Sequence, residues 1–193
     1  MRRPTLFALA TCTLVFTLAV IATQVAAQQD KSKRPSPPGT ATFAFDDGKT
    51  ITINYSRPKV NDPGSGQPRK IFGGLVPYGE VWRAGANEAT SLVTQANLTI
   101  GNTPVPAGSY TLYILPAENG PWKLIISKKT GQWGIPYPGE QNDVARINLQ
   151  TTKTPRTVQD FTIAFEKRGP NAGVLQFEWE NTKASADFSE ANK

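Results

Sequence analysis

The stretch that decides the fold is ATFAFDDGKTITINYS, residues 41–56. On both sides of DDG, apolar side chains alternate with polar ones, a pattern typical of two half-buried strands. A two-residue turn at Asp47-Gly48 would place the two apolar sets on opposite faces. A three-residue loop, 46–48, instead pairs Phe43 with Ile51 and places glycine at the left-handed position that such a loop needs. We therefore predict a hairpin with the longer loop.

Two further stretches have the same design. YTLYILPAENGPWKLIIS, residues 110–127, pairs Leu112 with Ile126 across a five-residue loop. FTIAFEKRGPNAGVLQFEW, residues 161–179, pairs Ile163 with Phe177 and Phe161 with Trp179, and turns at 169–171. Weaker strand patterns cover residues 91–95, 98–100 and 144–151.

These strands predict an all-β, single-domain fold. About eight short strands separated by Gly and Pro favour an antiparallel β-sandwich of jelly-roll-like type, with a closed β-barrel as the alternative. Two long stretches, 57–79 and 131–143, do not alternate and contain several aromatic residues. Long irregular loops in a compact domain are often functional. We expect both to pack near Trp82 at one end or edge of the sandwich.

The N-terminal residues predict export. Arg2 and Arg3 precede an apolar run over 6–22, and the small residues of 25–27 provide a cleavage site. This is the layout of a signal peptide, here 1–27, so we expect a periplasmic or extracellular protein with no membrane anchor after cleavage.

The remaining domain boundaries follow from composition. Residues 28–39 are polar and proline-rich, which predicts a flexible linker. The β-sandwich domain is then expected over 40–188, with a loose tail over 189–193.

Composition restricts the possible chemistry. The chain has no histidine, and its one cysteine, Cys12, lies in the leader. Ser-His-Asp and Cys-His catalysis and zinc binding by these residues are thereby excluded. The net charge of +6 is spread along the chain. The sequence therefore has no basic stripe of the kind that would indicate nucleic-acid binding. We predict no cofactor, no metal and no catalytic residues, and the oligomeric state stays open.

The candidate site is VWRAGANEAT, residues 81–90, which has no usable period. Gly85 allows the backbone to turn sharply, and Trp82 supplies an apolar wall. Arg83 has a rigid set of donors, Asn87 both donates and accepts, and Glu88 accepts. Such a set suits a sugar, a carboxylate or a peptide end.

The same residues allow two other interpretations. An internal Arg83–Glu88 pair, with Trp82 packed into the core, would make the segment a structural brace. A carboxylate-dependent hydrolase would instead use two of the acids in or beside the irregular stretches; these are Glu80, Glu88, Glu140 and Asp143. Trp122 and Trp179 fall on inward-facing strand positions, where core packing is expected.

Several motifs occur together in a recognisable order: YSRP (55–58), RKIFGGLVPYGEVWRAGANEAT (69–90), PAGSYTLYILP (106–116), Trp122 and Trp133-Gly134. Over about 40–179 the chain resembles the exported bacterial family filed as domain of unknown function 2911. The resemblance implies a β-rich exported domain and no assigned activity. By position it marks six residues, with Asp143 and Arg146 as outer candidates; the six are Arg69, Trp82, Arg83, Asn87, Glu88 and Thr90.

The leading hypothesis is a non-catalytic binding module for a small polar ligand or an envelope glycan held near 82–90. A structural or protein-partner domain is the alternative, and a hydrolase the third. The candidate binding residues are Trp82, Arg83, Asn87, Glu88, Thr90, Arg69, Trp133, Tyr137, Asp143 and Arg146.

Overall fold

The computed structural model describes residues 30–191. The predicted signal peptide lies outside the described residues, as do Gln28, Gln29 and the last two residues of the predicted tail. The chain divides into two units, 1–34 and 35–193. In the first, the Asp30 side chain accepts a hydrogen bond from the Ser32 amide and caps the short 3-10 helix η1, Lys31–Lys33. The second unit contains all the strands found within 30–191.

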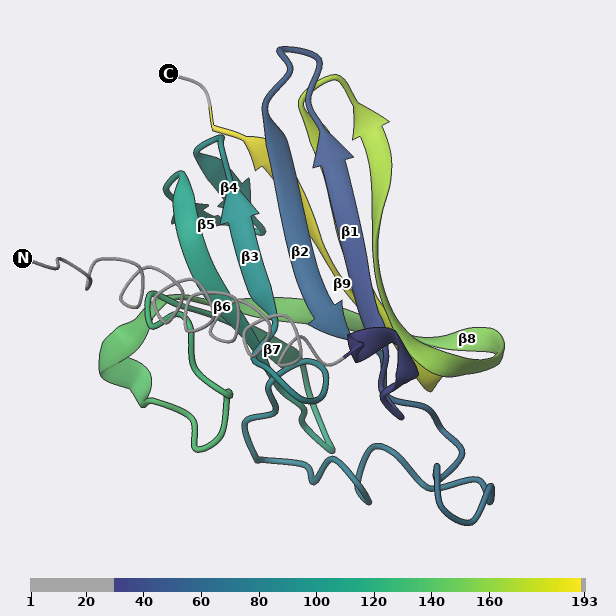
Figure 1. Cartoon of the computed structure of the whole chain (residues 1–193). Coiled ribbons are helices and arrows are strands. Elements are labelled where there is room, and N and C mark those ends of the chain that lie inside the picture. Colours follow the sequence, from purple (N-terminus) through teal and green to yellow (C-terminus); the bar gives the residue numbers. More distant parts are fainter. Residues whose placement is uncertain (1–29, 192–193) are drawn as a thin grey trace, which may run out of the picture. The chain divides into compact units, whose positions relative to one another are not determined.

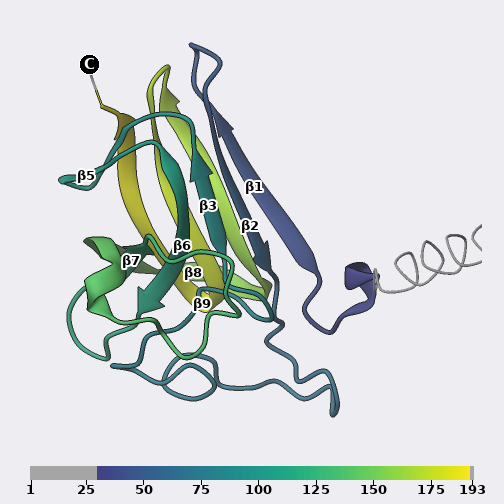
Figure 2. The same ribbon diagram turned by 60° about the vertical axis from the view of Figure 1, so that its left-hand side comes forward.

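The second unit is an all-β antiparallel sandwich. Its strands are β1 (Pro38–Ala44), β2 (Thr50–Ser56), β3 (Ser91–Thr94), β4 (Leu98–Ile100), β5 (Thr103–Val105), β6 (Gly108–Leu115), β7 (Trp122–Ser127), β8 (Asp143–Gly169) and β9 (Ala172–Glu190). The strand order is β1-β2-β3-β6-β7-β8-β9-β4-β5. β1, β2 and β3 face β8 and β9 across the core (Figures 1 and 2). The sheet does not close, so the sandwich prediction is confirmed over the barrel.

β8 belongs to both layers. Its first part, up to Leu149, pairs with β7. From Gln150 onward it pairs with β9 instead. The strand is 27 residues long, and its register shifts between Lys153 and Val158 and again before Thr162. These irregularities are typical of a strand that bends as it passes from one sheet to the next.

The predicted hairpin registers are largely confirmed. Phe43 pairs with Ile51 and Gly48 has a φ of 88°, as the three-residue loop requires. Leu112 also pairs with Ile126, and Ile163 with Phe177. One pairing was not found: the register shifts before Phe161 reaches Trp179, and their ring centroids lie 5.9 Å apart.

The structure also extends the predicted strands. β5 was not expected, because Pro104 interrupts its short pattern; as an edge strand it tolerates the missing N–H. β1 begins at Pro38, inside the predicted linker, and β9 continues through Ser189 and Glu190 of the predicted tail. That end of β9 is ordered because Glu190 pairs with Leu98 of β4.

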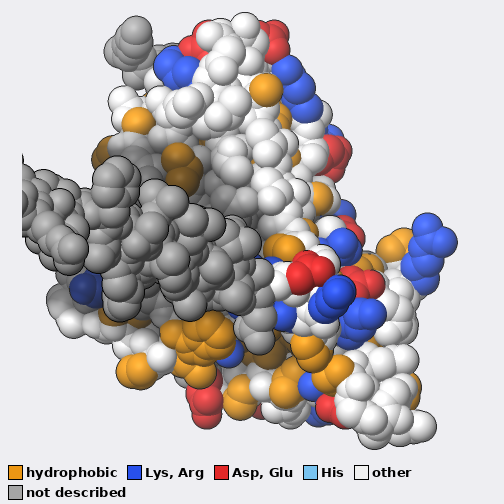
Figure 3. Space-filling model, in the orientation of Figure 1, with side chains coloured by type: hydrophobic (Ala, Val, Ile, Leu, Met, Phe, Trp, Pro, Cys, Tyr) orange, Lys and Arg blue, Asp and Glu red, His pale blue; other side chains and the backbone are white. Residues whose placement is uncertain are grey.

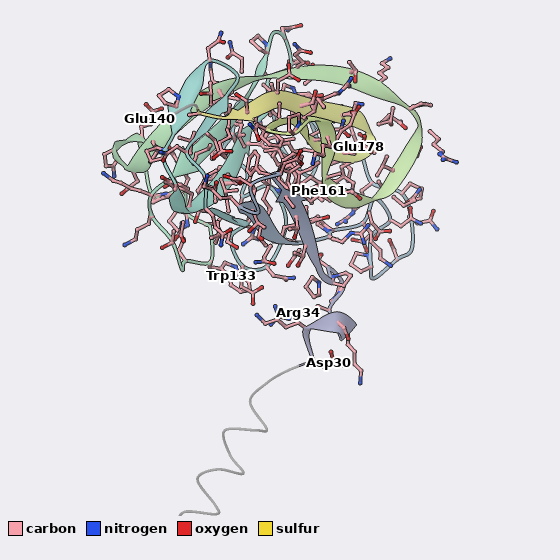
Figure 4. All side chains as sticks on the ribbon, turned by 90° about the horizontal axis from the view of Figure 1, so that it is seen from above. Asp30, Arg34, Trp133, Glu140, Phe161 and Glu178 are labelled. Atoms are coloured by element: carbon pink, nitrogen blue, oxygen red, sulfur yellow. The ribbon has the colours of Figure 1, made fainter. Side chains whose placement is uncertain are left out.

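Two aromatic clusters occupy the core. Near the β1–β2 turn, Phe43 packs edge-on against Phe45 and Phe188. The second cluster, called here the indole cluster, contains Phe72, Trp82, Trp122, Phe161 and Trp179. Trp122 and Trp179 are buried, which confirms the predicted core positions. Phe161 is seen inside the domain in Figure 4.

The long loops gather at the end of the sandwich that carries the indole cluster (Figures 1 and 2). Phe72 of the 57–79 stretch lies 6.2 Å from Trp82, centroid to centroid, as predicted. Hydrophobic side chains gather on this end of the molecule in the space-filling view (Figure 3). Within 30–191, no helix has the length and apolar character needed to span a membrane.

Candidate functional site

The Trp82–Thr90 segment is an irregular arch tied at both ends to β6. The Trp82 amide donates to the Ile114 carbonyl at 2.8 Å, and the Ile114 amide returns a bond of 2.8 Å. At the other end, the Leu112 amide donates to the Thr90 carbonyl at 2.9 Å. The residues between these anchors form neither helix nor strand. The predicted irregular insert on a β scaffold is therefore present.

Polar side chains of the arch donate hydrogen bonds to the arch itself and to the segments next to it. Thr90 is fully buried, and its Oγ1 donates to the Ala84 carbonyl at 2.7 Å. Asn87 Nδ2 donates to the Ser36 carbonyl at 2.9 Å and to Ser56 Oγ at 3.2 Å. Trp82 Nε1 donates to the Gly85 carbonyl at 3.0 Å. These bonds brace the arch against β2 and the segment that precedes β1.

The backbone of the arch is held in unusual conformations. Ala84 and Asn87 have φ values of 50° and 57°, in the left-handed region that side chains disfavour. Gly85 has a φ of 158°, and a Cβ there would lie 3.0 Å from Thr90 Oγ1. The side-chain bonds and the close packing together hold this conformation.

Arg83 binds two carbonyl oxygens rather than Glu88. Its Nη1 donates to Asn87 O at 2.8 Å and to Trp133 O at 3.2 Å. Its guanidinium carbon lies 5.7 Å from the centre of the Trp133 ring. Partial burial lowers the pKa of Arg83, although an arginine keeps its charge in proteins. The structure therefore does not contain the predicted internal Arg83–Glu88 pair within the described residues.

A cleft of about 310 Å³ lies beside the arch. Val81, Trp82, Arg83, Gly85 and Ala86 form one wall. The facing walls are mainly prolines and apolar side chains from the 57–79 and 131–143 stretches, including Pro58, Leu75, Val76, Pro77 and Ile135. A volume of this size suits a small-molecule site.

Hydrogen bonds position the cleft walls. The Phe161 amide donates to Pro58 O at 2.9 Å, which holds the chain after β2 against β8. Arg69 donates from Nη2 to Lys59 O at 2.7 Å, and its Nη1 lies 3.5 Å from Asp62 Oδ2. Arg69 thus lines the cleft and also closes the loop that forms it.

A separate polar cluster lies under the 131–143 stretch. Asp143 Oδ2 accepts from Tyr137 Oη at 2.6 Å and from Arg146 Nε at 2.8 Å. Arg146 Nη1 also contacts Glu140 Oε1 at 2.6 Å, and Glu140 opens η2, Glu140–Asn142. Burial, reinforced by the bond to Asp143, raises the pKa of Tyr137 to about 12. None of these residues lines the cleft.

The predicted binding residues thus fall into distinct places. Arg69, Trp82 and Arg83 line the cleft, while Asn87 and Thr90 are engaged inside the arch. Glu88 lines a different depression of about 230 Å³ beside Gln132. Trp133 is 52% exposed and lies at the edge of the domain (Figure 4). Its carbonyl oxygen accepts a hydrogen bond from Arg83. Tyr137, Asp143 and Arg146 form the polar cluster.

Sequence reasoning missed several lining residues. Pro35 and Ser36 come from the stretch predicted to be a flexible linker, and Lys59 comes from the irregular stretch 57–79, in which it was not singled out. Trp179 was predicted only as core; it is 1% exposed, yet it also lines the cleft. The density of turn-forming residues in 57–79 was the available signal, because such a stretch must fold over something when it carries buried residues such as Phe72 and Val76.

The site offers little for acid or metal chemistry. Glu80 is the single carboxylate among the described residues that line the cleft. Within 30–191, no group of three or more His, Cys, Asp or Glu side chains is placed to hold a metal ion.

Comparison with known proteins gives one match. A family model described as "Protein of unknown function (DUF2911)" matches residues 36–188, most of the chain and nearly the whole β-sandwich unit. No curated protein and no solved structure matches.

Proposed function

The chain belongs to the DUF2911 family, whose description assigns no activity, and we propose that it is an exported, non-catalytic binding module whose ligand occupies the cleft beside the arch. The observation that carries this proposal is that a braced, irregular segment forms one wall of a cleft of about 310 Å³. Sites held rigid before binding lose less entropy when the ligand arrives. The brace is therefore interpreted as preorganisation of that wall.

The character of the walls restricts the ligand. Prolines and the exposed side chains of Leu75 and Ile135 present apolar surface, and most polar side chains in the lining are charged, namely Lys59, Arg69, Glu80 and Arg83. A neutral, highly hydroxylated glycan has no charge and little apolar surface to match such a lining. The two classes predicted from the sequence are a small polar ligand and an envelope glycan; we favour the small ligand and add that it has some apolar surface.

A structural or protein-partner role is the second candidate. It is favoured by the inward bonds of Asn87 and Thr90, which brace the fold without reaching the cleft. A hydrolase has less support, because the cleft lining lacks a second described carboxylate to act with Glu80.

A ligand screen by two-dimensional NMR tests the proposal. Small organic acids, amides, alcohols and short glycans are added to the labelled protein, and binders are expected to shift the amides of 81–86. Ala86 lines the cleft and has no positive φ, so Ala86→Leu narrows the cleft without straining the arch. It should weaken every binder at least 10-fold.

Ala164→Leu, on a partly exposed position of β8 outside the cleft lining, is the matched control and should leave affinity unchanged. A screen in which no compound shifts the 81–86 amides would favour the structural role. Binding that Ala86→Leu leaves intact would place the ligand elsewhere and overturn the proposal.

A further inference from the structure

The guanidinium of Arg83 has an unused edge. Its Nη1 donates to two carbonyl oxygens, Asn87 O and Trp133 O. Among the described residues, nothing accepts from Nε or Nη2. These two atoms form the side of the guanidinium that binds a carboxylate through two parallel hydrogen bonds. Because Nη1 is fixed, that edge is held in one orientation.

The charge of Arg83 has no counter-ion in the described part of the chain. Its side chain is partly buried, and it contacts two neutral carbonyl oxygens and an indole ring. Desolvation lowers the pKa of Arg83 without a carboxylate to oppose it. A partly desolvated cation gains when an anion is brought to it.

A second donor in the lining is also unpartnered. Trp179 is 1% exposed, and its Nε1 has no acceptor within the described residues. Buried indole N–H groups usually have a partner, since leaving one without an acceptor costs about 1–3 kcal/mol. Trp179 and Arg83 line the same cleft, so the buried indole borders the site that contains the unused edge of Arg83.

The remaining charges favour a single negative charge on the ligand. Lys59 is exposed on the lining and forms no ion pair in the described structure, whereas Arg69 is already paired with Asp62. Glu80 also lines the cleft and would repel a dianion more than a monoanion. The apolar walls add a preference for a hydrocarbon body.

We propose that the ligand is an organic carboxylate with an apolar body, an inference that rests on the proposed function. Its carboxylate group binds the Nε–Nη2 edge of Arg83, and its body lies along Trp82 and Val76. The arch then has two roles: its inward bonds fix the backbone, and its arginine receives the anion.

NMR titrations with hexanoate, hexanamide and inorganic phosphate test this inference. Hexanoate should shift the Arg83 Nε–H and Trp179 Nε1–H resonances and bind at least 10-fold more tightly than hexanamide, which has the same shape and no charge. Phosphate, which lacks the apolar body, should bind at least 10-fold more weakly than hexanoate.

Variants assign the charge preference to residues. Arg83→Gln should reduce hexanoate affinity to that of hexanamide, while Arg156→Gln, at an exposed position outside the cleft lining, should leave it unchanged. Because Arg83→Gln also removes bonds that brace the arch, Glu80→Gln is the second test. Glu80 is exposed, so its neutral variant should fold normally and bind hexanoate about 2–5-fold more tightly through reduced repulsion.

The outcomes separate this inference from the proposed function. Equal binding of hexanoate and hexanamide with shifts at 81–86 would overturn the carboxylate while keeping the cleft as a binding site. Phosphate binding as tightly as hexanoate would overturn the apolar body. No shift of Arg83 Nε–H across acetate, hexanoate and decanoate would overturn the inference, and a blank wider screen would remove the proposed function as well.

Discussion

Replacing Thr90 by valine tests whether one buried hydroxyl holds the arch in place. Thr90 and Ala84 are both fully buried, and the 2.7 Å bond from Oγ1 is the one described contact that satisfies the Ala84 carbonyl. Valine keeps the shape but cannot donate, so a buried acceptor is left unpaired, at a cost of about 1–3 kcal/mol. For a domain of this size that corresponds to a fall in Tm of about 2–12 °C.

Urea unfolding of the wild type, Thr90→Val and Thr42→Val measures the effect. Thr42 is an exposed residue of β1, so its valine variant makes the same chemical change without a buried partner and should stay within about 0.5 kcal/mol of the wild type. The m-value of Thr90→Val should match that of the wild type, which would assign the change to stability alone. If Thr90→Val were as stable as the Thr42→Val control, the hydroxyl bond would not be what holds the arch.

Three further predictions concern the loops. Gly134→Ala should destabilise the protein more than Gly131→Ala, by about 1–3 kcal/mol in urea, because both glycines have positive φ but only at Gly134 does the new Cβ lie 3.0 Å from Ala89 Cβ; equal losses would contradict this packing. Asn87→Gly should lose about 1–2 kcal/mol through its two amide bonds, and Asn87→Ala about 1 kcal/mol more, since alanine resists the φ of 57°; the reverse order would refute the strain. Tyr137 has a raised pKa of about 12 in the folded state, so its stabilising contribution is complete below pH 10 and falls between pH 10 and 12. Tyr137→Phe should therefore reduce the alkaline loss of stability by up to about 1.4 kcal/mol per pH unit, measured by urea unfolding from pH 9 to 12; an unchanged slope would contradict the assignment.

Local alternation made the hairpins predictable. Phe43–Ile51 and Leu112–Ile126 were readable because one face of each strand is buried, so a slip of one residue would expose an apolar set. The turn residues agreed with the same register, as Gly48 illustrates. Agreement between two independent local signals is what made these predictions secure.

The middle of β8 and the end of β9 carried no such signal. Residues 150–160 of β8 are mostly exposed and polar, with Pro155 among them, so neither face is marked as core. Their pairing with 180–185 of β9 depends on the sheets they continue rather than on their own pattern. Long-range context of this kind cannot be read from alternation.

The candidate site was located by sequence but not resolved. Gly85 and the lack of periodicity marked 81–90 correctly as an irregular segment. Which side chains point inward depends on partners distant in the chain, such as Ser36 for Asn87 and Trp133 for Arg83. Composition shows that a residue can donate a hydrogen bond, but it does not show to which acceptor.

β8 pairs first with β7 and then with β9, so this one strand connects the two sheets of the protein. Chain cleavage among the exposed residues around Pro155 would loosen the ribbon that reaches β7 on one side and β9 on the other. If β8 detached, β7 and β9 would both expose unpaired backbone amides and carbonyls. Such exposed edges can pair with strands of another molecule. Protection of this single ribbon from proteases therefore bears on whether the protein stays soluble, as well as on whether it stays folded.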